Sequence, residues 1–156
     1  MTADAAAAAP GPVAAAPDPG FPMPLERGKI REFAIATGSD SPAYLDDPAP
    51  PIPLTFLRTS AFWRTPDAAS PLAGAGVQLD LRRILHGEQE YEFPAGPLRA
   101  GTELTVRSSL ESITEKEGKR GGTMTLIVTV EEFTDAGGTV VARSRSTLIQ
   151  TGKAPS

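Results

Sequence analysis

The sequence of 156 residues contains no cysteine, a single histidine, His86, and no long hydrophobic run. Without cysteine the chain has neither disulfides nor thiolates, and a cytoplasmic protein is the simplest expectation. One histidine without cysteine cannot supply the usual ligands of a zinc site, so we expect no metal and no other cofactor. A membrane-spanning helix needs about 18 consecutive apolar residues, so we expect no membrane segment.

Positive charge is also scarce. The chain has 15 Lys and Arg against 19 Asp and Glu, with a net charge of −4 and a pI of about 5.0. A nucleic-acid-binding protein presents a basic face, so we expect no nucleic-acid partner. The hydrophobic content of 40% and the length suit one globular domain.

Alanine, proline and glycine dominate the beginning of the chain. Residues 1–23 offer little to bury and predict a disordered N-terminal extension, with a docking tail as the functional alternative. We therefore expect one domain over residues 24–152 and a short tail over residues 153–156.

Two helices are predicted before any strand. Ile30, Phe33, Ala34 and Thr37 repeat at helical spacing, so residues 27–37 should form a short helix that ends at Gly38. A second, apolar helix of about three turns is predicted to begin near Pro53 and to be buried. Its aromatic residues are Phe56, Phe62 and Trp63.

Strands dominate the second half. Alternating patterns predict strands over residues 85–93, 104–111, 124–130 and 139–150, and the turn sequence over residues 135–138 is typical of a hairpin. The small residues Ala142, Ser144 and Ser146 share one face of the last strand and suggest close packing against a helix or another backbone. Helices followed by antiparallel strands predict an α+β fold. So few strands cannot cover both sides of a helix, which makes an oligomer plausible.

The segment around His86 offers one possible acid–base pair. In a regular strand His86 and Glu88 would project from the same face, about 7 Å apart at their Cα atoms, and such a pair can move protons near neutral pH. The structural alternative is that the glutamates from Glu88 to Glu92 are exposed, or are neutralised by Arg143 and Arg145 of another strand.

Several separated segments resemble the N-terminal-type MaoC-like dehydratase domain, also called the FAS1-like dehydratase region. The resemblance covers roughly residues 25–151 and implies a hotdog fold, in which an antiparallel sheet wraps around a central helix. The segment from Phe93 to Pro97 looks longer than the usual turn of the family. The matching segments are Lys29–Ala34, Pro50–Leu57, Leu85–Gln89, Tyr91–Phe93 and Pro97–Gly101.

The resemblance also locates a catalytic loop. Active members of the wider family, the (R)-specific enoyl-CoA hydratases and 3-hydroxyacyl dehydratases, carry a loop of the form G-D-x-N-P-L-H, in which Asp and His act as acid and base on an acyl thioester. Without a gap, this loop falls on Gly38–Tyr44, so Ser39 stands at the Asp position and Tyr44 at the His position. An unassisted serine or a tyrosine of pKa near 10 is poorly placed to accept the substrate proton.

The resemblance therefore implies a subunit of a heteromeric 3-hydroxyacyl-CoA or 3-hydroxyacyl-carrier-protein dehydratase. A second MaoC-like hotdog subunit with an intact Asp/His loop would supply catalysis, while this chain shapes the acyl-binding tunnel. Tyr44, Phe56, Phe62 and Trp63 are candidates for the pocket or the interface. Two alternatives stay open: a stand-alone thioesterase or dehydratase that uses His86 and Glu88, and a non-catalytic module that binds acyl thioesters or scaffolds a complex.

Overall fold

The computed structural model describes residues 18–65, 70–75, 77–117 and 122–152. Most of the predicted disordered extension and the whole C-terminal tail lie outside these ranges. The described elements are, in chain order, β1 (Phe21–Pro24), α1 (Arg27–Ala36), α2 (Pro42–Leu45), the 3₁₀ helix η1 (Phe56–Phe62), α3 (Pro71–Gly74), the 3₁₀ turn η2 (Leu81–Arg83), β2 (Ile84–Glu92), β3 (Glu103–Glu117), β4 (Thr123–Thr134) and β5 (Val140–Gln150).

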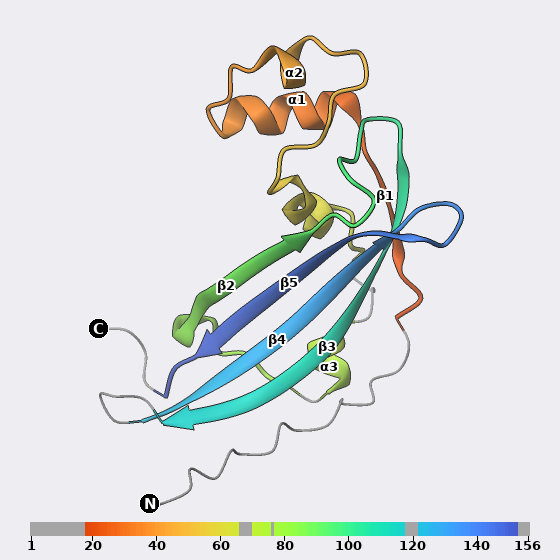
Figure 1. Cartoon of the computed structure of the whole chain (residues 1–156). Helices are drawn as coiled ribbons and strands as arrows, with labels where there is room; N and C mark the ends of the chain where they lie inside the picture. The colour runs from red at the N-terminus through yellow and green to blue at the C-terminus, as the bar shows by residue number, and fades with distance from the viewer. Residues whose placement is uncertain (1–17, 66–69, 76, 118–121, 153–156) are drawn as a thin grey trace, which may run out of the picture.

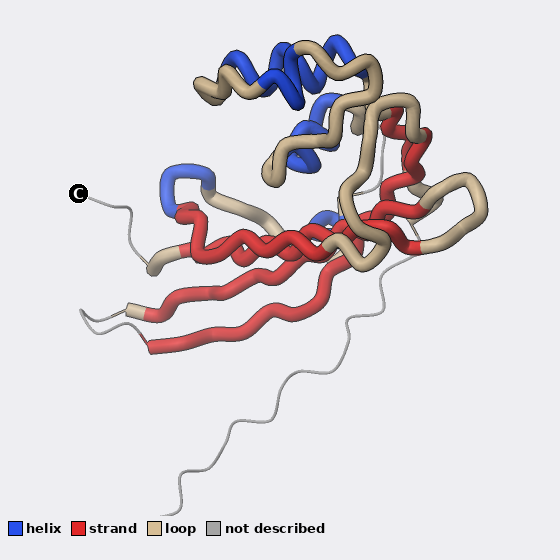
Figure 2. The backbone as a smooth tube through the Cα atoms, turned by 45° about the horizontal axis from the view of Figure 1, so that its top comes forward, coloured by secondary structure: helices blue, strands red, loops and turns tan. Residues whose placement is uncertain are grey.

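The strands form one antiparallel sheet in the order β1-β3-β4-β5-β2 (Figure 1). The helices α1 and α2 and the turn η1 lie on one side of this sheet (Figure 2). This arrangement confirms the α+β expectation. Breaks in register with one extra residue interrupt β2, β3 and β5, and such bulges bend and twist the strands that carry them.

One sheet face, which we call the inner face, packs against the helical segments. Its core side chains include Val106, Phe133 and Ala142, which lie opposite one another on β3, β4 and β5 and cluster with Phe56 and Ile30. Phe33 of α1 meets Phe56 edge-on with ring centroids 5.4 Å apart. These contacts fix α1 and η1 over the sheet because aromatic edge-to-face pairs add to the burial energy.

The expected start of the domain at residue 24 is too late. Phe21 and Met23 of β1 are core residues, and β1 pairs with β3 from Phe21↔Val106 to Pro24↔Glu103. Gly20, at φ +83°, precedes the strand, and the side chain of Asp18 accepts hydrogen bonds from the backbone N–H groups of Gly20 and Ser108. The ordered domain therefore includes residues that composition alone assigned to the extension.

The two predicted helices differ in outcome. The helix over residues 27–37 is confirmed, as α1 spans Arg27–Ala36 and Gly38 follows with φ +79°. The buried three-turn helix is wrong in type and in burial. The structure has the short 3₁₀ helix η1, which buries Phe56 and Leu57 but leaves Phe62 81% exposed and the preceding Leu54 74% exposed.

Candidate functional site

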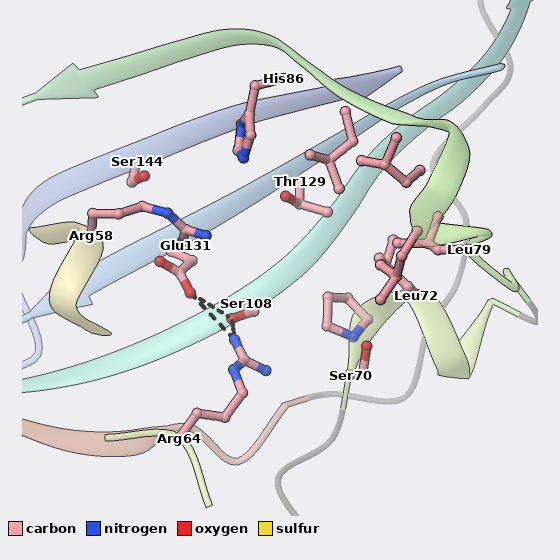
Figure 3. Close-up of a pocket in the computed structure, with 15 residues that line it drawn as sticks. Arg58, Arg64, Ser70, Leu72, Leu79, His86, Ser108, Thr129, Glu131 and Ser144 are labelled. Carbon is pink, nitrogen blue, oxygen red and sulfur yellow. Dashed lines mark hydrogen bonds and ion pairs between the residues drawn. The ribbon is translucent and has the colours of Figure 1, made fainter. Parts of the chain in front are cut away.

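The inner face of the sheet contains a cavity of about 410 Å³ between the strands and the segments that follow η1 (Figure 3). Its volume is within the usual range of small-molecule sites. Strand residues form the floor of the cavity, and η1, α3 and η2 contribute to its walls. The lining residues are Arg58, Arg64, Ser70, Pro71, Leu72, Leu79, Leu81, Ile84, His86, Ser108, Thr129, Glu131, Ser144, Ser146 and Leu148.

Small side chains on the central strands leave room for this cavity. Ser144 and Ser146 of β5 lie opposite Glu131 and Thr129 of β4, and all four line the cavity. Ala142, two residues before Ser144, is instead buried in the core. The expectation of close packing on this face therefore holds for Ala142, whereas the two serines border open space.

A network around Glu131 forms one end of the cavity. Its carboxylate accepts a hydrogen bond from Ser60 Oγ at 2.9 Å and pairs with Arg64 Nη2 at 3.3 Å. Arg64 also donates to Ser108 Oγ, and its guanidinium lies 5.2 Å from the centre of the Phe21 ring. The Glu131 side chain is only 17% exposed. Such hydrogen bonds and the opposite charge of Arg64 compensate for the loss of contact between this carboxylate and water.

Arg58 reaches the same end of the cavity from η1 (Figure 3). Its guanidinium makes no hydrogen bond or ion pair with the other described residues. The charge of Arg58 affects the pKa of Tyr91 of β2. Burial raises the pKa of this phenol, the charge of Arg58 opposes the increase, and the charge of Glu131 adds to it. Arg58 and Glu131 therefore act on the same part of the inner face with opposite charge.

The structure separates His86 from Glu88. The register of β2 against β5 shifts between these two residues, so His86 lies opposite Leu148 while Glu88 lies opposite Thr147. Neighbouring residues of a strand point to opposite faces. His86 consequently points into the cavity and Glu88 projects from the outer face. The expectation that both share one face is wrong, because the bulge at Gly87 reverses the alternation.

The glutamates of β2 instead meet arginines on the outer face. Glu92 lies 3.8 Å from Arg143, and Glu90 is the register partner of Arg145. Arg145 also pairs with Glu111 of β3 at 2.6 Å, and the hydrogen bonds from Arg145 lower the pKa of Glu111. The structural alternative therefore holds mainly as exposure: Glu88, Glu90 and Glu92 are exposed, and Glu92 also pairs with Arg143 of another strand.

The segment that corresponds to the family's catalytic loop joins α1 to α2. Gly38 provides the left-handed turn, and Ser39 Oγ accepts a hydrogen bond from the backbone N–H of Ser41 at 3.4 Å. Neither Ser39 nor Tyr44 lines the cavity. The structure therefore does not bring these two positions together with His86.

None of the four aromatic candidates lines the described cavity. Phe56 is 1% exposed in the core, and Trp63 packs against the same core. Phe62 is largely exposed, Tyr44 is half-buried, and none of the four lines the cavity. A role of these four residues in a pocket or at an interface with a partner stays a prediction.

Sequence reasoning missed the charged residues of the cavity: Arg58, Arg64 and Glu131. One signal was present, because Arg58 is the only charged residue in the segment between Leu54 and Trp63. Glu131 faces inward in the register of β4, on the same side as Phe133, a position that the sequence pattern alone did not distinguish from a solvated strand end.

Within the described ranges, no three His, Cys, Asp or Glu side chains gather closely enough to hold a metal ion. The helices among these residues are also too short or too polar to cross a membrane.

Comparisons with known proteins point to one family. The family described as "FAS1-like, dehydratase domain region" matches residues 18–144. A UPF0336 protein of Parafrankia is 33% identical over 142 residues, which cover 86% of this chain and 88% of the relative. A UPF0336 protein of Streptomyces coelicolor is 37% identical over 108 residues, covering 64% of this chain and 69% of the relative.

Solved structures confirm the hotdog fold. A chain of the HadBC (3R-hydroxyacyl-ACP dehydratase) complex from Mycobacterium tuberculosis superposes with a TM-score of 0.64 at 26% identity, covering 85% of this chain and 92% of that one. A MaoC-like dehydratase gives a TM-score of 0.66 at 26% identity over 83% of this chain and 39% of its own. The ChsH1–ChsH2 complex from Mycobacterium tuberculosis, at 16% identity, gives a TM-score of 0.63 over 94% of this chain and 87% of its own, and shows the fold alone.

Proposed function

The chain belongs to the FAS1-like dehydratase domain region family, and from this premise we propose that it is the non-catalytic subunit of a heteromeric 3-hydroxyacyl-thioester dehydratase. The substrate is an acyl chain carried on coenzyme A or on a carrier protein, and the complex works in the cytoplasm. The observation that carries the proposal is that Ser39 and Tyr44 stand where the resemblance places the Asp and His of the catalytic loop of active members of the wider family.

The reaction explains why these two positions matter. Dehydration removes a proton from C2 of the thioester and breaks the C3–O bond, so that the hydroxyl leaves as water and a double bond forms. One group must accept the C2 proton and another must protonate the leaving hydroxyl. Neither Ser39 nor Tyr44 has a described histidine or carboxylate partner for this chemistry, so a partner hotdog provides both groups.

The contribution of this chain is to bind the acyl part. The cavity on the inner face has apolar walls from Leu72, Leu79, Ile84 and Leu148, which can hold an aliphatic chain out of water. His86 lines the same cavity but has no carboxylate neighbour on its own strand, because Glu88 faces the other way. The separation speaks against the alternative in which His86 and Glu88 act as an acid–base pair.

A hydration assay with crotonyl-CoA tests the proposal. The full chain alone should be inactive, and its complex with a hotdog subunit that has an intact G-D-x-N-P-x-H loop should add water to the double bond. Replacing the partner's loop His should abolish this activity, whereas His86→Gln in this chain should leave the catalytic step intact. Efficient hydration by the purified chain alone would refute the non-catalytic assignment.

The remaining alternative, a module that binds acyl thioesters without any catalysis, is distinguished in the same experiment. It predicts binding by this chain and no turnover in the complex with a catalytically competent partner. The cavity is compatible with both ideas, so the assay with the partner decides between them.

A further inference from the structure

The cavity has two chemically different ends (Figure 3). Arg58, Glu131 and Ser144 gather at one end, and Leu72 and Leu79 lie at the other. A plain aliphatic chain would satisfy only the second end. Buried or half-buried polar groups that a ligand leaves without partners reduce its affinity. The polar end therefore selects for a ligand that carries a polar group of its own.

The charges at the polar end favour an anion. Glu131 and Arg64 neutralise each other as a pair 3.3 Å apart. Arg58 adds a second guanidinium, which has no anionic partner among the described residues. With His86 counted as neutral, the charged side chains of the described residues that line the cavity, Arg58, Arg64 and Glu131, sum to one positive charge. Arg58 is itself exposed, so water partly screens its attraction for an anion, and hydrogen-bond donors in the cavity must supplement it.

The hydroxyl groups on the cavity floor suit an acceptor. Ser144 Oγ accepts a hydrogen bond from Gln89 Nε2 at 2.9 Å, which leaves its own proton free to be donated. Thr129 and Ser146 add two further hydroxyls to the lining. A carboxylate has two oxygens that accept several hydrogen bonds and pairs well with a guanidinium. An ammonium group would instead be repelled by Arg58.

We propose that the cavity binds an aliphatic ligand that carries a carboxylate, with the carboxylate beside Arg58 and the hydrocarbon against the leucines. The inference rests on the proposed function insofar as the ligand is an acyl thioester, and it then defines the substrate class as acyl chains with a second, free carboxylate. The same chemistry would come from a free fatty acid. The two ligand classes are distinguished by measuring whether a carboxylate strengthens the binding of a thioester or only that of a free acid.

Isothermal titration calorimetry of the full chain measures this preference. Octanoate is compared with octan-1-ol, and the mono-coenzyme-A thioester of octanedioic acid with octanoyl-CoA. The carboxylate should improve binding by about tenfold or more in at least one of the pairs, as expected for a charge-assisted hydrogen bond. A gain in the thioester pair identifies an acyl-thioester ligand, and a gain only for octanoate identifies a free fatty acid.

Variants of Arg58 link the preference to the cavity. Arg58→Gln should reduce the ratio between the affinities of the ligands with and without the carboxylate to about one. Arg58→Lys should retain much of this ratio because the charge remains. Arg107→Gln is the matched control, since Arg107 is exposed on β3 and does not line the cavity. Arg58 is itself exposed, so its variants should fold normally, and thermal unfolding verifies this.

Equal binding of both members in each pair, or a gain that survives Arg58→Gln, would overturn the inference. These results are separable from those of the hydration assay. If the complex hydrates crotonyl-CoA but the chain shows no preference for ligands with a carboxylate, only the carboxylate inference is refuted. If the chain prefers ligands with a carboxylate but its complex with the partner shows no turnover, only the proposed function is refuted.

Discussion

Gly20 and Gly38 both have left-handed backbone conformations, with φ of +83° and +79°, but their surroundings differ. A Cβ on Gly20 would lie 2.9 Å from the carbonyl oxygen of Val106 and 3.0 Å from side-chain atoms of Thr105 and Arg107. A Cβ on Gly38 would meet no atom within 4 Å. At Gly38 glycine is favoured only by the left-handed backbone conformation. At Gly20 neighbouring atoms of β3 also occupy the space that a Cβ would need.

Alanine at each position should separate these two effects. Gly38→Ala should lower the free energy of unfolding by about 1 kcal/mol, the cost of a left-handed conformation for a residue with a side chain. Gly20→Ala should lower it by about 3 kcal/mol, because β1 must also move away from β3. Urea unfolding of both variants measures the difference, and equal losses would contradict the crowding at Gly20.

Gly87 shows why the sequence could not locate the candidate site. The alternation from His86 to Glu92 correctly predicts a strand, and it places the glutamates on one face. A Cβ on Gly87 would lie 2.9 Å from Ile149 Cδ1, so the backbone there approaches β5 closely, and the register shifts at this residue. A bulge depends on the partner strand, which an alternation pattern does not contain. The sequence pattern therefore could not predict which face of the sheet carries the His86 side chain.

At the scale of elements, η1 contains two phenylalanines with opposite environments. Phe56 is 1% exposed and packs edge-on against Phe33, while Phe62 at the other end of the same helix is 81% exposed. Phe56 therefore anchors η1 and α1 to the sheet, and Phe62 contributes little to the stability of the chain by itself.

Substitution by alanine should reveal this difference. Phe56→Ala should lower the free energy of unfolding by about 3–5 kcal/mol, as for other large core side chains. Phe62→Ala should change it by less than about 0.5 kcal/mol, as at other exposed positions. Thermal or urea unfolding compares the two, and Phe62 serves as the control for residue type and helix. A small effect at Phe56 would show that it is not an anchor.

The local sequence pattern predicts α1 but does not predict β1. The repeat from Ile30 to Thr37 and the following Gly38 suffice to predict a helix and its end. β1 contains Pro22 and Pro24, which argue against a strand when read alone. The sheet accepts them because β1 is an edge strand that pairs only with β3. Its existence thus depends on a partner about 80 residues later in the chain, with Phe21 opposite Val106.

At the scale of the whole molecule, the cavity and the loop Gly38–Tyr44 are distinct places. The cavity belongs to the inner face between η1 and β2, and no residue of the loop lines it. The resemblance predicted the fold, which the solved structures confirm, and its prediction that the loop lacks the acid–base pair stays a prediction. The charged end of the cavity depends on which strand residues face inward and on Arg58, so it appeared only in three dimensions.

A partner subunit gives the exposed end of η1 a role. Phe62 projects into solvent, and the nearby part of the chain also exposes Leu54, which borders an apolar hollow with Ile52 and Leu98. A contiguous exposed apolar patch, unlike a single exposed side chain, can mark a protein interaction site. In the proposed heteromer we expect the partner hotdog to cover Phe62, because aromatic residues that become buried at an interface supply much of its binding energy.

Phe62→Ser should therefore weaken the complex with the catalytic subunit by about tenfold or more while leaving the unfolding of the isolated chain unchanged. Ile35→Ser is the control, since Ile35 is 55% exposed on α1, a different element with its own surface. Calorimetric titration of the two subunits measures both affinities. If Ile35→Ser weakens the complex and Phe62→Ser does not, the partner binds over α1 and the assignment of the interface to η1 fails. If only Phe62→Ser weakens it, η1 joins the acyl cavity to the subunit that acts on the substrate, because Arg58 and Phe62 belong to the same helix.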